Sequence, residues 1–335
     1  MQLRNIKLNK KGGVEMSTLH NFKSYKIPII INLFNRIEPI KKLMKILLQV
    51  KPSKLYIASD GYRTDIDGEV EKVDEVRKYI LANITWECEV KTLFREKNLG
   101  CKYALHGAVQ WFFQQEERGI VLEDDILPSL SFFTFCEKML EMYRDDKRIG
   151  SISGRNELGQ CQTNLDYSFT SKFFCWGWAS WSDRVLDNNV ELANTSIVNG
   201  NIYKGLHFKE QLLLEGMIGL IKSKQVNSWA YPYDLSFRQK RQLCLIPSKN
   251  MIQNIGLDII GAHSNGGSED SIEYFDSYLP KFNSDIIVKA NNKFMNKFIE
   301  QRYLNIVTLY IFSKIEYLGK IRKIVKNIKL QFNSK

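Results

Sequence analysis

The sequence predicts an α/β fold with a mostly parallel central sheet flanked by helices. Two observations support this class. Short apolar runs rich in β-branched residues alternate with amphipathic segments up to about residue 150, which is the pattern of βαβ units. Several of these runs end directly in polar clusters. In open α/β sheets ligands bind beyond the carboxyl ends of the strands, so these clusters mark a candidate site.

The elements can be justified in order. Residues 27–34 (IPIIINLF) are continuously apolar, as in a buried parallel strand. Pro39 stands where the first turn of a helix tolerates proline, and apolar residues then recur at helical spacing. Residues 54–58 form the next strand, which completes a right-handed βαβ unit. The patterns further predict a helix at 69–82, a strand at 86–95, a helix at 101–117, a strand at 120–122, a helix at 131–144, a strand at 149–154, a helix at 206–224 and a strand at 243–247.

The charge distribution suggests a domain organisation. The net charge is +11, but residues 289–335 hold eleven Lys or Arg and two Asp or Glu, so the rest of the chain carries only about +2. We therefore expect an N-terminal extension at 1–26, a main domain at 27–285 and a basic helical tail at 286–335. A basic tail suits nucleic acid, an anionic lipid surface or simple solubility, but the nearly neutral body argues against a nucleic-acid partner.

Cysteine usage and the chain start point to a cytoplasmic protein. The six cysteines form no CxxC pair, which favours free thiols in a reducing compartment. Residues 1–15 are basic and lack the apolar core of a signal peptide, and Met16 is an alternative start. No apolar run reaches the length of a membrane span. Peripheral attachment to the inner face of the plasma membrane through the tail stays open.

The segment GIVLEDDILPS places three carboxylates, Glu123, Asp124 and Asp125, directly after a buried strand. Adjacent carboxylates repel one another, and a divalent cation such as Mg²⁺ or Mn²⁺ would relieve the repulsion while leaving positions open for phosphate oxygens. A solvated acidic turn is the alternative. Asp60 and Arg95 follow other predicted strands. We expect all of these side chains to converge on one edge of the sheet.

Several longer segments together resemble glycosyltransferases of the GT-A fold, most closely bacterial family-2-type enzymes of surface-polysaccharide and lipopolysaccharide assembly. The resemblance covers roughly residues 27–270. Its segments are REKNLGCKYALHGAVQWFF, RGIVLEDDILPSLSFFTFC, RIGSISGRN, FFCWGWASW, NSWAYPYDLSF and LCLIPSKNMIQNIGLDIIGAHS.

The resemblance implies a nucleotide-sugar donor and a divalent cation, Mn²⁺ or Mg²⁺. The triplet matches the DxD-type motif, with Asp125 as the direct metal ligand and with Asp124 and Glu123 aiding the metal or the ribose. His263 matches a late histidine that completes the metal or diphosphate site. A structural or exposed histidine is the alternative for His263.

The resemblance also implies a nucleoside subsite. Asp60 matches an acidic residue that contacts the nucleoside, although an Asp in SDG can also shape a turn. Arg95 and Asn98 match the polar residues of the R-x-x-N-L-G element, directed toward base, ribose or diphosphate. Gly100 would open a helix whose N-terminal amides favour anions.

The catalytic base is less clearly marked. Many similar enzymes carry an acidic residue directly after the tryptophan matched by Trp229, whereas this chain has Ala230. Asp234 is then the first candidate for deprotonating the acceptor hydroxyl, with Glu157 and Asp183 as alternatives, and the reaction can be inverting or retaining. Four tryptophans are candidates for contacts to sugar or acceptor, with a core role as the alternative: Trp176, Trp178, Trp181 and Trp229.

We therefore expect a metal-dependent glycosyltransferase that acts on a glycan or lipid-linked acceptor. Two other functions remain open. The first is a non-catalytic sugar-binding or nucleotide-binding protein. The second is a sugar nucleotidyltransferase, but such enzymes usually place a Gly-rich phosphate loop after the first strand, and that position here reads NLFNRIEP.

Overall fold

The computed structural model describes residues 24–160, 165–192, 200–256, 272–278, 280–282 and 286–302. In this part of the chain the strands are β1 (Ile29–Leu33), β2 (Lys54–Ser59), β3 (Glu89–Phe94), β4 (Arg118–Glu123), β5 (Ile126–Pro128), β6 (Ile149–Ser153), β7 (Tyr167–Thr170), β8 (Trp178–Trp181), β9 (Leu243–Pro247) and β10 (Ile252–Asn254). The helices are α1 (Ile37–Val50), α2 (Glu69–Ala82), α3 (Gly100–Phe113), α4 (Leu130–Met142), α5 (Ser182–Val185), α6 (Phe208–Lys222), α7 (Ala230–Gln239) and α8 (Asn292–Arg302), with a 3-10 helix at Gly200–Tyr203.

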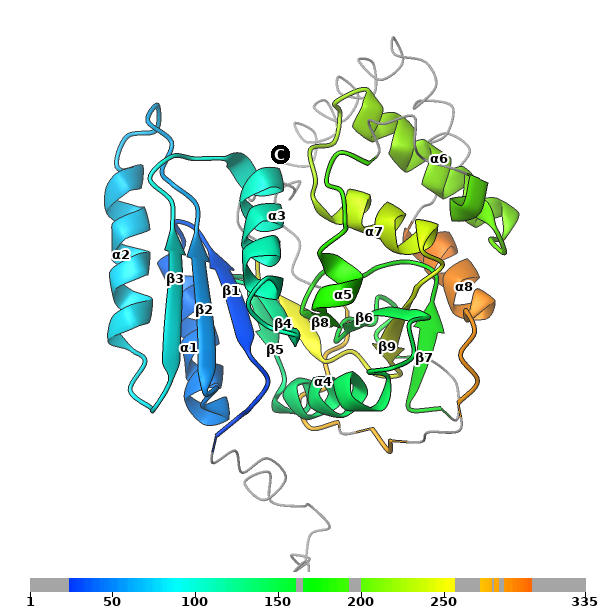
Figure 1. Cartoon of the computed structure of the whole chain (residues 1–335), viewed down its shortest axis with the longest axis horizontal. Helices are drawn as coiled ribbons and strands as arrows, with labels where there is room; N and C mark the ends of the chain where they lie inside the picture. Colours follow the sequence, from blue (N-terminus) through cyan, green and yellow to red (C-terminus); the bar gives the residue numbers. More distant parts are fainter. Residues whose placement is uncertain are drawn as a thin grey trace, which may run out of the picture.

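One sheet organises the described residues (Figure 1). Its order is β3-β2-β1-β4-β8-β6-β9-β7, while β10 and β5 form a separate two-stranded sheet. Strands β3, β2, β1 and β4 are parallel to one another. Strand β8 runs antiparallel to both β4 and β6, and β9 is parallel to β6. The predicted α/β class with a mostly parallel sheet is confirmed.

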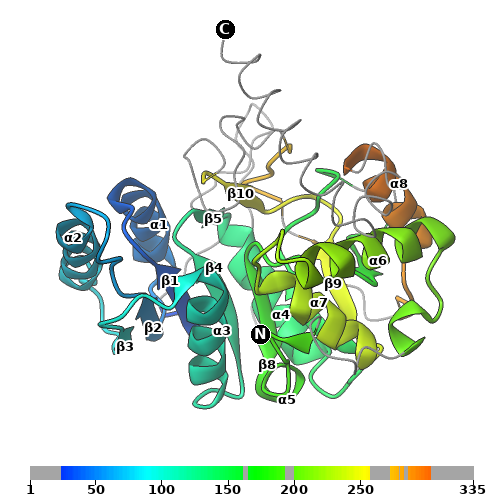
Figure 2. The same ribbon diagram turned by 90° about the horizontal axis from the view of Figure 1, so that it is seen from above.

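Helices cover both faces of this sheet, as the view from above shows (Figure 2). Alternate residues of β1 explain why both faces are covered, because Ile29 and Ile31 pack in one core cluster and Ile30 packs in another. Helices α1, α2 and α4 contribute to the first cluster, and α3 and α7 contribute to the second. Full burial of one such aliphatic side chain is worth about 1.5–3 kcal/mol, so the two faces together provide most of the apolar stabilisation.

The chain leaves β4 through a fixed path. The β5 strand pairs with β10, and Ser129 then caps helix α4 by accepting a hydrogen bond from the Phe132 amide at 3.3 Å. A serine at this position satisfies an otherwise unpaired amide of the first helical turn. The carboxylate triplet therefore lies in a short segment that is anchored on both sides.

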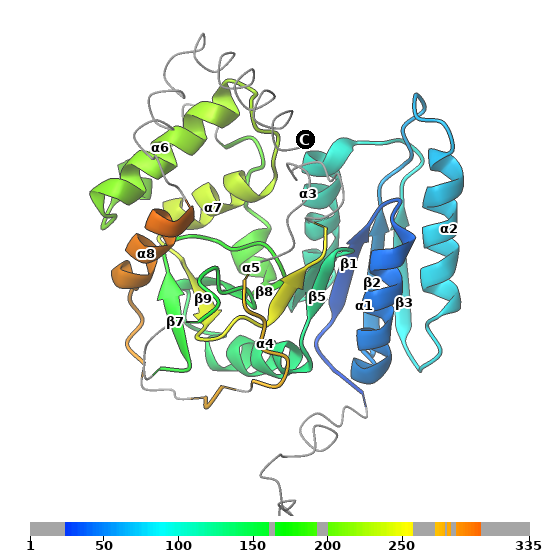
Figure 3. The same ribbon diagram turned by 180° about the vertical axis from the view of Figure 1, so that it is seen from behind.

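The segment predicted as a basic tail begins with a helix packed on the body of the fold. Helix α8 lies beside the β7 end of the sheet (Figure 3). Its apolar residues Phe294, Met295, Phe298 and Ile299 are buried against a cluster that includes Phe174. Residues 303–335, which hold most of the predicted amphipathic tail, lie outside the described residues.

Two further observations concern the compartment and membrane predictions. Within the described ranges, no helix is both long enough and apolar enough to cross a bilayer. The five cysteines in those ranges, Cys88, Cys101, Cys136, Cys175 and Cys244, are free thiols.

The prediction that the tryptophans of FFCWGWASW contact sugar or acceptor is wrong for two of them, for which the alternative of a core role holds. Trp178 and Trp181 lie in β8 and are 0% and 1% exposed. Trp178 contacts the ring of Phe173, and Trp181 donates its indole N–H to the Leu140 carbonyl at 3.2 Å. Because β8 fills the centre of the sheet between β4 and β6, both rings belong to the core.

Candidate active site

The strand directions bring most of the predicted site residues to one edge of the sheet. We call it the carboxylate edge, because it holds the triplet Glu123, Asp124 and Asp125. The parallel strands β1, β2, β3 and β4 all end at this edge. Strand β6 ends there as well, because it is antiparallel to β8, which is itself antiparallel to β4. Asp60, Arg95, the triplet and Glu157 follow four of these strands, so segments from distant parts of the sequence meet there.

The carboxylates of Asp124 and Asp125 converge on one cation, the guanidinium of Arg36. Arg36 Nη2 lies 2.9 Å from Asp125 Oδ2 and also donates to Asp124 Oδ1, and Nε lies 3.3 Å from Asp124 Oδ2. Arg36 is the residue before α1, where the chain has just left β1. The sequence analysis did not assign Arg36 a role, although its place directly after a predicted strand was the available signal.

Burial and like charges perturb the triplet. Burial, followed by the charges of Asp125 and Asp124, raises the pKa of Glu123 to about 8. Burial also raises the pKa of Asp124 to about 6, against the opposing effect of Arg36. Burial lowers the pKa of Arg36, but the charges of Asp124 and Asp125 outweigh it and raise the pKa overall. At this position two aspartates thus share one guanidinium, that of Arg36.

Glu123 occupies a different position from the two aspartates. It is the last residue of β4 and pairs in register with Asn32 of β1. Its charge raises the pKa values of both Cys101 and Cys175, after the larger effect of burial. Glu123 thus lies among the thiols at the end of the strand, while Asp124 and Asp125 meet Arg36.

The segment around β10 encloses Asp125 from a second side. The Ile255 amide donates to the Asp125 carbonyl at 2.9 Å. A Cβ atom added to Gly256 would lie 2.0 Å from Asp125 Oδ2, a distance that real Cβ atoms do not reach. Gly256 itself donates its amide to Asn254 Oδ1 at 2.8 Å. The glycine of the NIG segment therefore leaves the space that the Asp125 carboxylate fills, a role the sequence analysis missed.

Asp60 caps helix α3. Its carboxylate accepts hydrogen bonds at 3.0 Å from the amides of Gly61, Leu99 and Gly100. The expectation that the amides at the start of this helix are available to an anionic ligand is therefore wrong for Leu99 and Gly100, because Asp60 already serves as the anion. A nucleoside contact of Asp60 stays a prediction, limited to its remaining acceptor capacity.

Arg95 and Asn98 lie at the same edge, near Asp60 and helix α3. Asn98 Nδ2 donates to the Gly61 carbonyl at 2.7 Å. An Arg95 side-chain nitrogen lies close to Gly107 of α3, where an added Cβ would be 3.0 Å away. Burial lowers the pKa of Arg95, with Asp60 opposing that effect. Arg77, which the sequence analysis did not consider, donates to the Asp60 and Arg95 carbonyls at 2.9 and 2.8 Å and joins β2 to β3.

Glu157 lies at the carboxylate edge, next to a buried arginine. Arg155 donates to Glu157 Oε1 at 3.3 Å and to the Ile252 carbonyl at 3.0 Å. The guanidinium carbon of Arg155 stacks 4.9 Å from the centre of the Trp176 ring. Trp176 is partly exposed, whereas Trp229 is 4% exposed and stacks on Trp178. Burial therefore excludes a direct sugar contact for Trp229, as it does for Trp178 and Trp181. Of the four predicted tryptophans, Trp176 remains a candidate for that contact.

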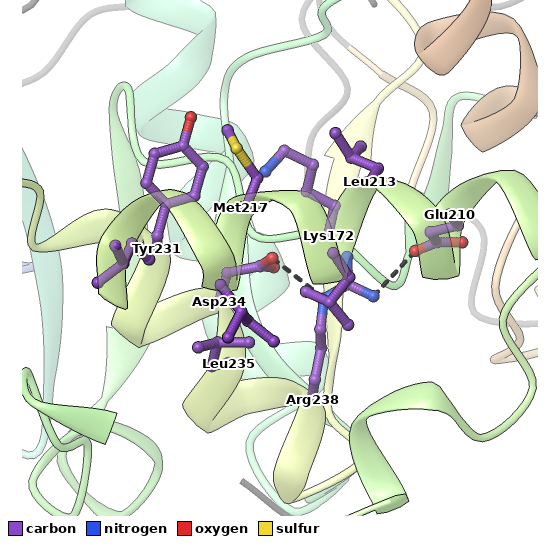
Figure 4. A pocket seen from close by; sticks show the side chains of 11 residues that line it. Lys172, Glu210, Leu213, Met217, Tyr231, Asp234, Leu235 and Arg238 are labelled. Atoms are coloured by element: carbon purple, nitrogen blue, oxygen red, sulfur yellow. Dashed lines mark hydrogen bonds and ion pairs between the residues drawn. The ribbon is translucent and has the colours of Figure 1, made fainter. Parts of the chain in front are cut away.

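The structure contradicts the prediction that Asp234 is the base. Asp234 Oδ1 accepts from the Phe173 amide at 2.7 Å, and Oδ2 accepts from Arg238 Nε at 3.0 Å. Arg238 also donates to Glu210 at 2.9 Å. Both oxygens of Asp234 are thus used in a buried ion-pair network. This network lines a small pocket between α6 and α7, where Tyr231 and Lys172 also lie (Figure 4).

Asp183 lies at the wrong edge of the sheet for the predicted role. It follows β8, whose last residue Trp181 pairs with Arg118 at the start of β4. The start of β4 is roughly 16 Å from its carboxylate end, given about 3.3 Å per residue. Asp183 forms ion pairs with Lys147 and Arg184 instead. Glu157 is consequently the base candidate that shares an edge with the triplet. His263 lies outside the described residues.

The donor set suits a cation that takes further ligands from elsewhere. In the ranges that the structure describes, no group of three or more His, Cys, Asp or Glu could hold a metal ion. Two aspartates nevertheless converge on one positive charge, that of Arg36. Mg²⁺ and Mn²⁺ commonly use one or two carboxylates together with substrate phosphates and water. The pair fits such a cation but does not form a closed protein site.

Comparisons with known proteins leave the family open. No protein-family model and no curated protein matches the chain. Among solved structures, the chain is similar to HddC from Yersinia pseudotuberculosis, with 11% identity, 48% of this chain and 79% of that chain covered, and a TM-score of 0.30. The corresponding values for HddC complexed with GMP-PN are 11%, 48%, 79% and 0.29. For UDP-glucose pyrophosphorylase complexed with UDP-glucose they are 9%, 69%, 94% and 0.34. TM-scores this low do not show that these proteins share a fold or a function with the chain.

Proposed function

We propose that the chain is a nucleotide-sugar-dependent glycosyltransferase whose donor binds at the carboxylate edge, and that residues 27–285 form its catalytic domain. The convergence of Asp124 and Asp125 on a single positive charge, directly beyond the parallel strands, is the observation that carries this proposal. The motif resemblance to GT-A glycosyltransferases supplies the reaction class.

The reaction forms a bond between an acceptor hydroxyl oxygen and the anomeric carbon of the donor sugar. The bond from that carbon to the phosphate oxygen of the donor breaks, so a UDP- or GDP-sugar releases the nucleoside diphosphate and a CMP-sugar releases CMP. Glu157 is the proposed acceptor of the hydroxyl proton, since it is the base candidate on the carboxylate edge. When bound, a divalent cation would be held by Asp124 and Asp125 and would supply charge neutralisation for the leaving diphosphate.

The remaining residues of the edge have supporting roles in this proposal. Asp60 fixes the start of α3 and keeps acceptor capacity for the nucleoside. Trp176, backed by Arg155, offers a partly exposed ring to the sugar or acceptor, since aromatic faces suit apolar sugar faces. We keep a glycan or lipid-linked acceptor and peripheral association with the membrane as parts of the proposal.

Product analysis distinguishes this function from its alternatives. The purified chain would be incubated with UDP-, GDP- and CMP-sugars and Mn²⁺, and also with sugar 1-phosphates and nucleoside triphosphates. A glycosyltransferase releases the donor's nucleotide, whereas a nucleotidyltransferase releases inorganic diphosphate from a nucleoside triphosphate. Release of inorganic diphosphate, without release of a nucleotide from a sugar donor, would contradict the proposal. Nucleotide binding without either product would favour a binding protein.

Co-sedimentation with anionic liposomes tests the membrane part. Because α8 packs on the body, the truncation should remove residues 303–335 and leave residues 292–302 in place. The full chain should bind more strongly than the truncated one, since basic residues near an anionic surface each contribute about 1 kcal/mol. Equal binding of both proteins would contradict a membrane role for this segment.

A further inference from the structure

The guanidinium of Arg36 contacts three of the four carboxylate oxygens of Asp124 and Asp125, the groups to which a divalent cation would bind. It contacts Asp124 through two nitrogens and Asp125 through one, so both carboxylates are already paired. Asp125 Oδ2 is also enclosed by Gly256, because even one added carbon atom there would lie 2.0 Å away. A divalent cation at this oxygen would face the like charge of the Arg36 guanidinium, which lies 2.9 Å from the same atom, so repulsion opposes its binding while Arg36 stays in place.

Arg36 is also the most easily displaced member of the group. Its side chain is 25% exposed, compared with 5% for Asp124 and 18% for Asp125. It precedes α1 with an extended backbone and makes no side-chain cap of that helix. Within the described residues, its guanidinium has hydrogen bonds to the two aspartates alone. The aspartates, by contrast, lie in the segment anchored by β5 and β10.

The charge balance favours an exchange of cations. One guanidinium faces two carboxylates at close range. A divalent cation carries twice the charge of Arg36 and would neutralise the pair more fully. A nucleoside diphosphate arriving with that cation would offer it phosphate oxygens, and the released guanidinium would regain a partner, since its planar donors match phosphate oxygens.

We propose that Arg36 is the resident counter-cation of Asp124 and Asp125, and that a divalent cation binds only by displacing it. This inference rests on the proposed metal-dependent function. It adds that Arg36 and the divalent cation compete for the carboxylates of Asp124 and Asp125. Metal bound in the absence of nucleotide is then weak in the native protein, and nucleotide and metal assist each other's binding.

The test measures Mn²⁺ binding without any substrate, by the electron paramagnetic resonance signal of free Mn²⁺. Arg36→Gln should bind Mn²⁺ at least about tenfold more tightly than the native chain, which corresponds to about 1.4 kcal/mol. Lys97→Gln is the matched control, because Lys97 is an exposed cation in the loop after β3 at the same edge. It should leave the affinity within about twofold. Arg36→Gln combined with Asp125→Asn should lose the gain.

Thermal unfolding keeps the test valid if the variant is less stable. Arg36→Gln should be stabilised by Mn²⁺ more than the native chain is. If Arg36→Gln bound Mn²⁺ no more tightly than the native chain, or if Lys97→Gln gained as much affinity, competition between Arg36 and the metal would be refuted. The proposed function would remain intact. No Mn²⁺ binding by any variant, even with UDP, GDP or CMP present, would overturn both the competition and the metal-dependent function.

Discussion

Two groups in this protein share one composition, an arginine between two carboxylates, but have different surroundings. Arg36 bridges Asp124 and Asp125 in loops at the strand ends, with side-chain exposures of 25%, 5% and 18%. Arg238 bridges Asp234 and Glu210 between two helices, with exposures of 5%, 7% and 3%. In the first group, which we call open, the arginine side chain is partly exposed to solvent, whereas in the second group, which we call closed, all three side chains are buried.

From this difference we infer different purposes for two groups that each place an arginine between two carboxylates. In the closed group, Asp234 also accepts the Phe173 amide, so α7 is fixed to the segment before β8. Loss of Arg238 would leave the buried carboxylates of Asp234 and Glu210 without their shared cation, which is costly. In the open group, we propose that a divalent cation replaces Arg36. We interpret the first group as a ligand site and the second as a structural connection.

The largest expected effect is on the closed group. Arg238→Ala leaves both Asp234 and Glu210 without their cation in a buried position. The free energy of unfolding should fall by about 3–5 kcal/mol, the usual cost of breaking a buried pair. Urea denaturation would measure it. Arg36→Gln should cost no more than about 1–2 kcal/mol, and Mn²⁺ should restore the loss. Similar costs for both variants, without an effect of Mn²⁺, would contradict the comparison.

Asp125→Asn tests the functional half of the comparison. The substitution keeps the shape of the side chain but removes one of the two negative charges that hold the cation. We expect nucleotide-sugar turnover to fall by about 100-fold or more, with thermal stability nearly unchanged. Asp234→Asn should show the reverse, with lower stability but near-native turnover per folded molecule. Full turnover of Asp125→Asn in the presence of a chelator would refute the role of the triplet.

Glu157→Gln examines the proposed base. Loss of a general base commonly costs 100-fold or more in rate, so kcat should fall by roughly that factor while KM for the donor changes little. Asp183→Asn is the matched control, since Asp183 is a carboxylate at the opposite edge with exposed ion pairs. Initial rates of nucleotide release would measure both variants. Equal rates of Glu157→Gln and the native chain would remove Glu157 from the mechanism.

Gly256→Ala should have a smaller effect. The new methyl group would displace the Asp125 carboxylate, and Mn²⁺ affinity in the presence of nucleotide should drop by about tenfold, or about 1.4 kcal/mol. Gly68→Ala is the control, because Gly68 has a φ of 69° with open space around it. That variant should lose about 1 kcal/mol of stability through backbone strain and keep its Mn²⁺ affinity. Equal Mn²⁺ affinities for both variants would count against the contact.

The first half of the fold was predictable because each element there is decided by its own residues. Helix α2 begins and ends where its periodicity predicted, at Glu69 and Ala82, and β2 extends only one residue beyond the predicted strand. Parallel strands joined by helices follow one handedness rule. The shared edge of Asp60, Arg95 and the triplet could therefore be deduced without coordinates.

The second half depends on pairings that local patterns do not contain. Strand β8 is only four residues long and is buried on both faces, so its sequence did not decide between a core role and a sugar contact for its tryptophans. Asp234 stands on a helix that sequence periodicity did not identify, and its ion pair with Glu210 through Arg238 joins residues far apart in the chain. Arg36 was visible in the sequence, but its meeting with Asp124 across 88 residues was not.

Thermal unfolding with nucleotide and metal tests the central claim most directly. The native chain and Asp125→Asn would be heated with UDP, GDP or CMP, each with and without Mn²⁺. We predict that one nucleotide raises the Tm of the native chain only when Mn²⁺ is present, and that Asp125→Asn loses this shift. Stabilisation without Mn²⁺, or an equal shift in Asp125→Asn, would contradict a metal and nucleotide site at the carboxylate edge.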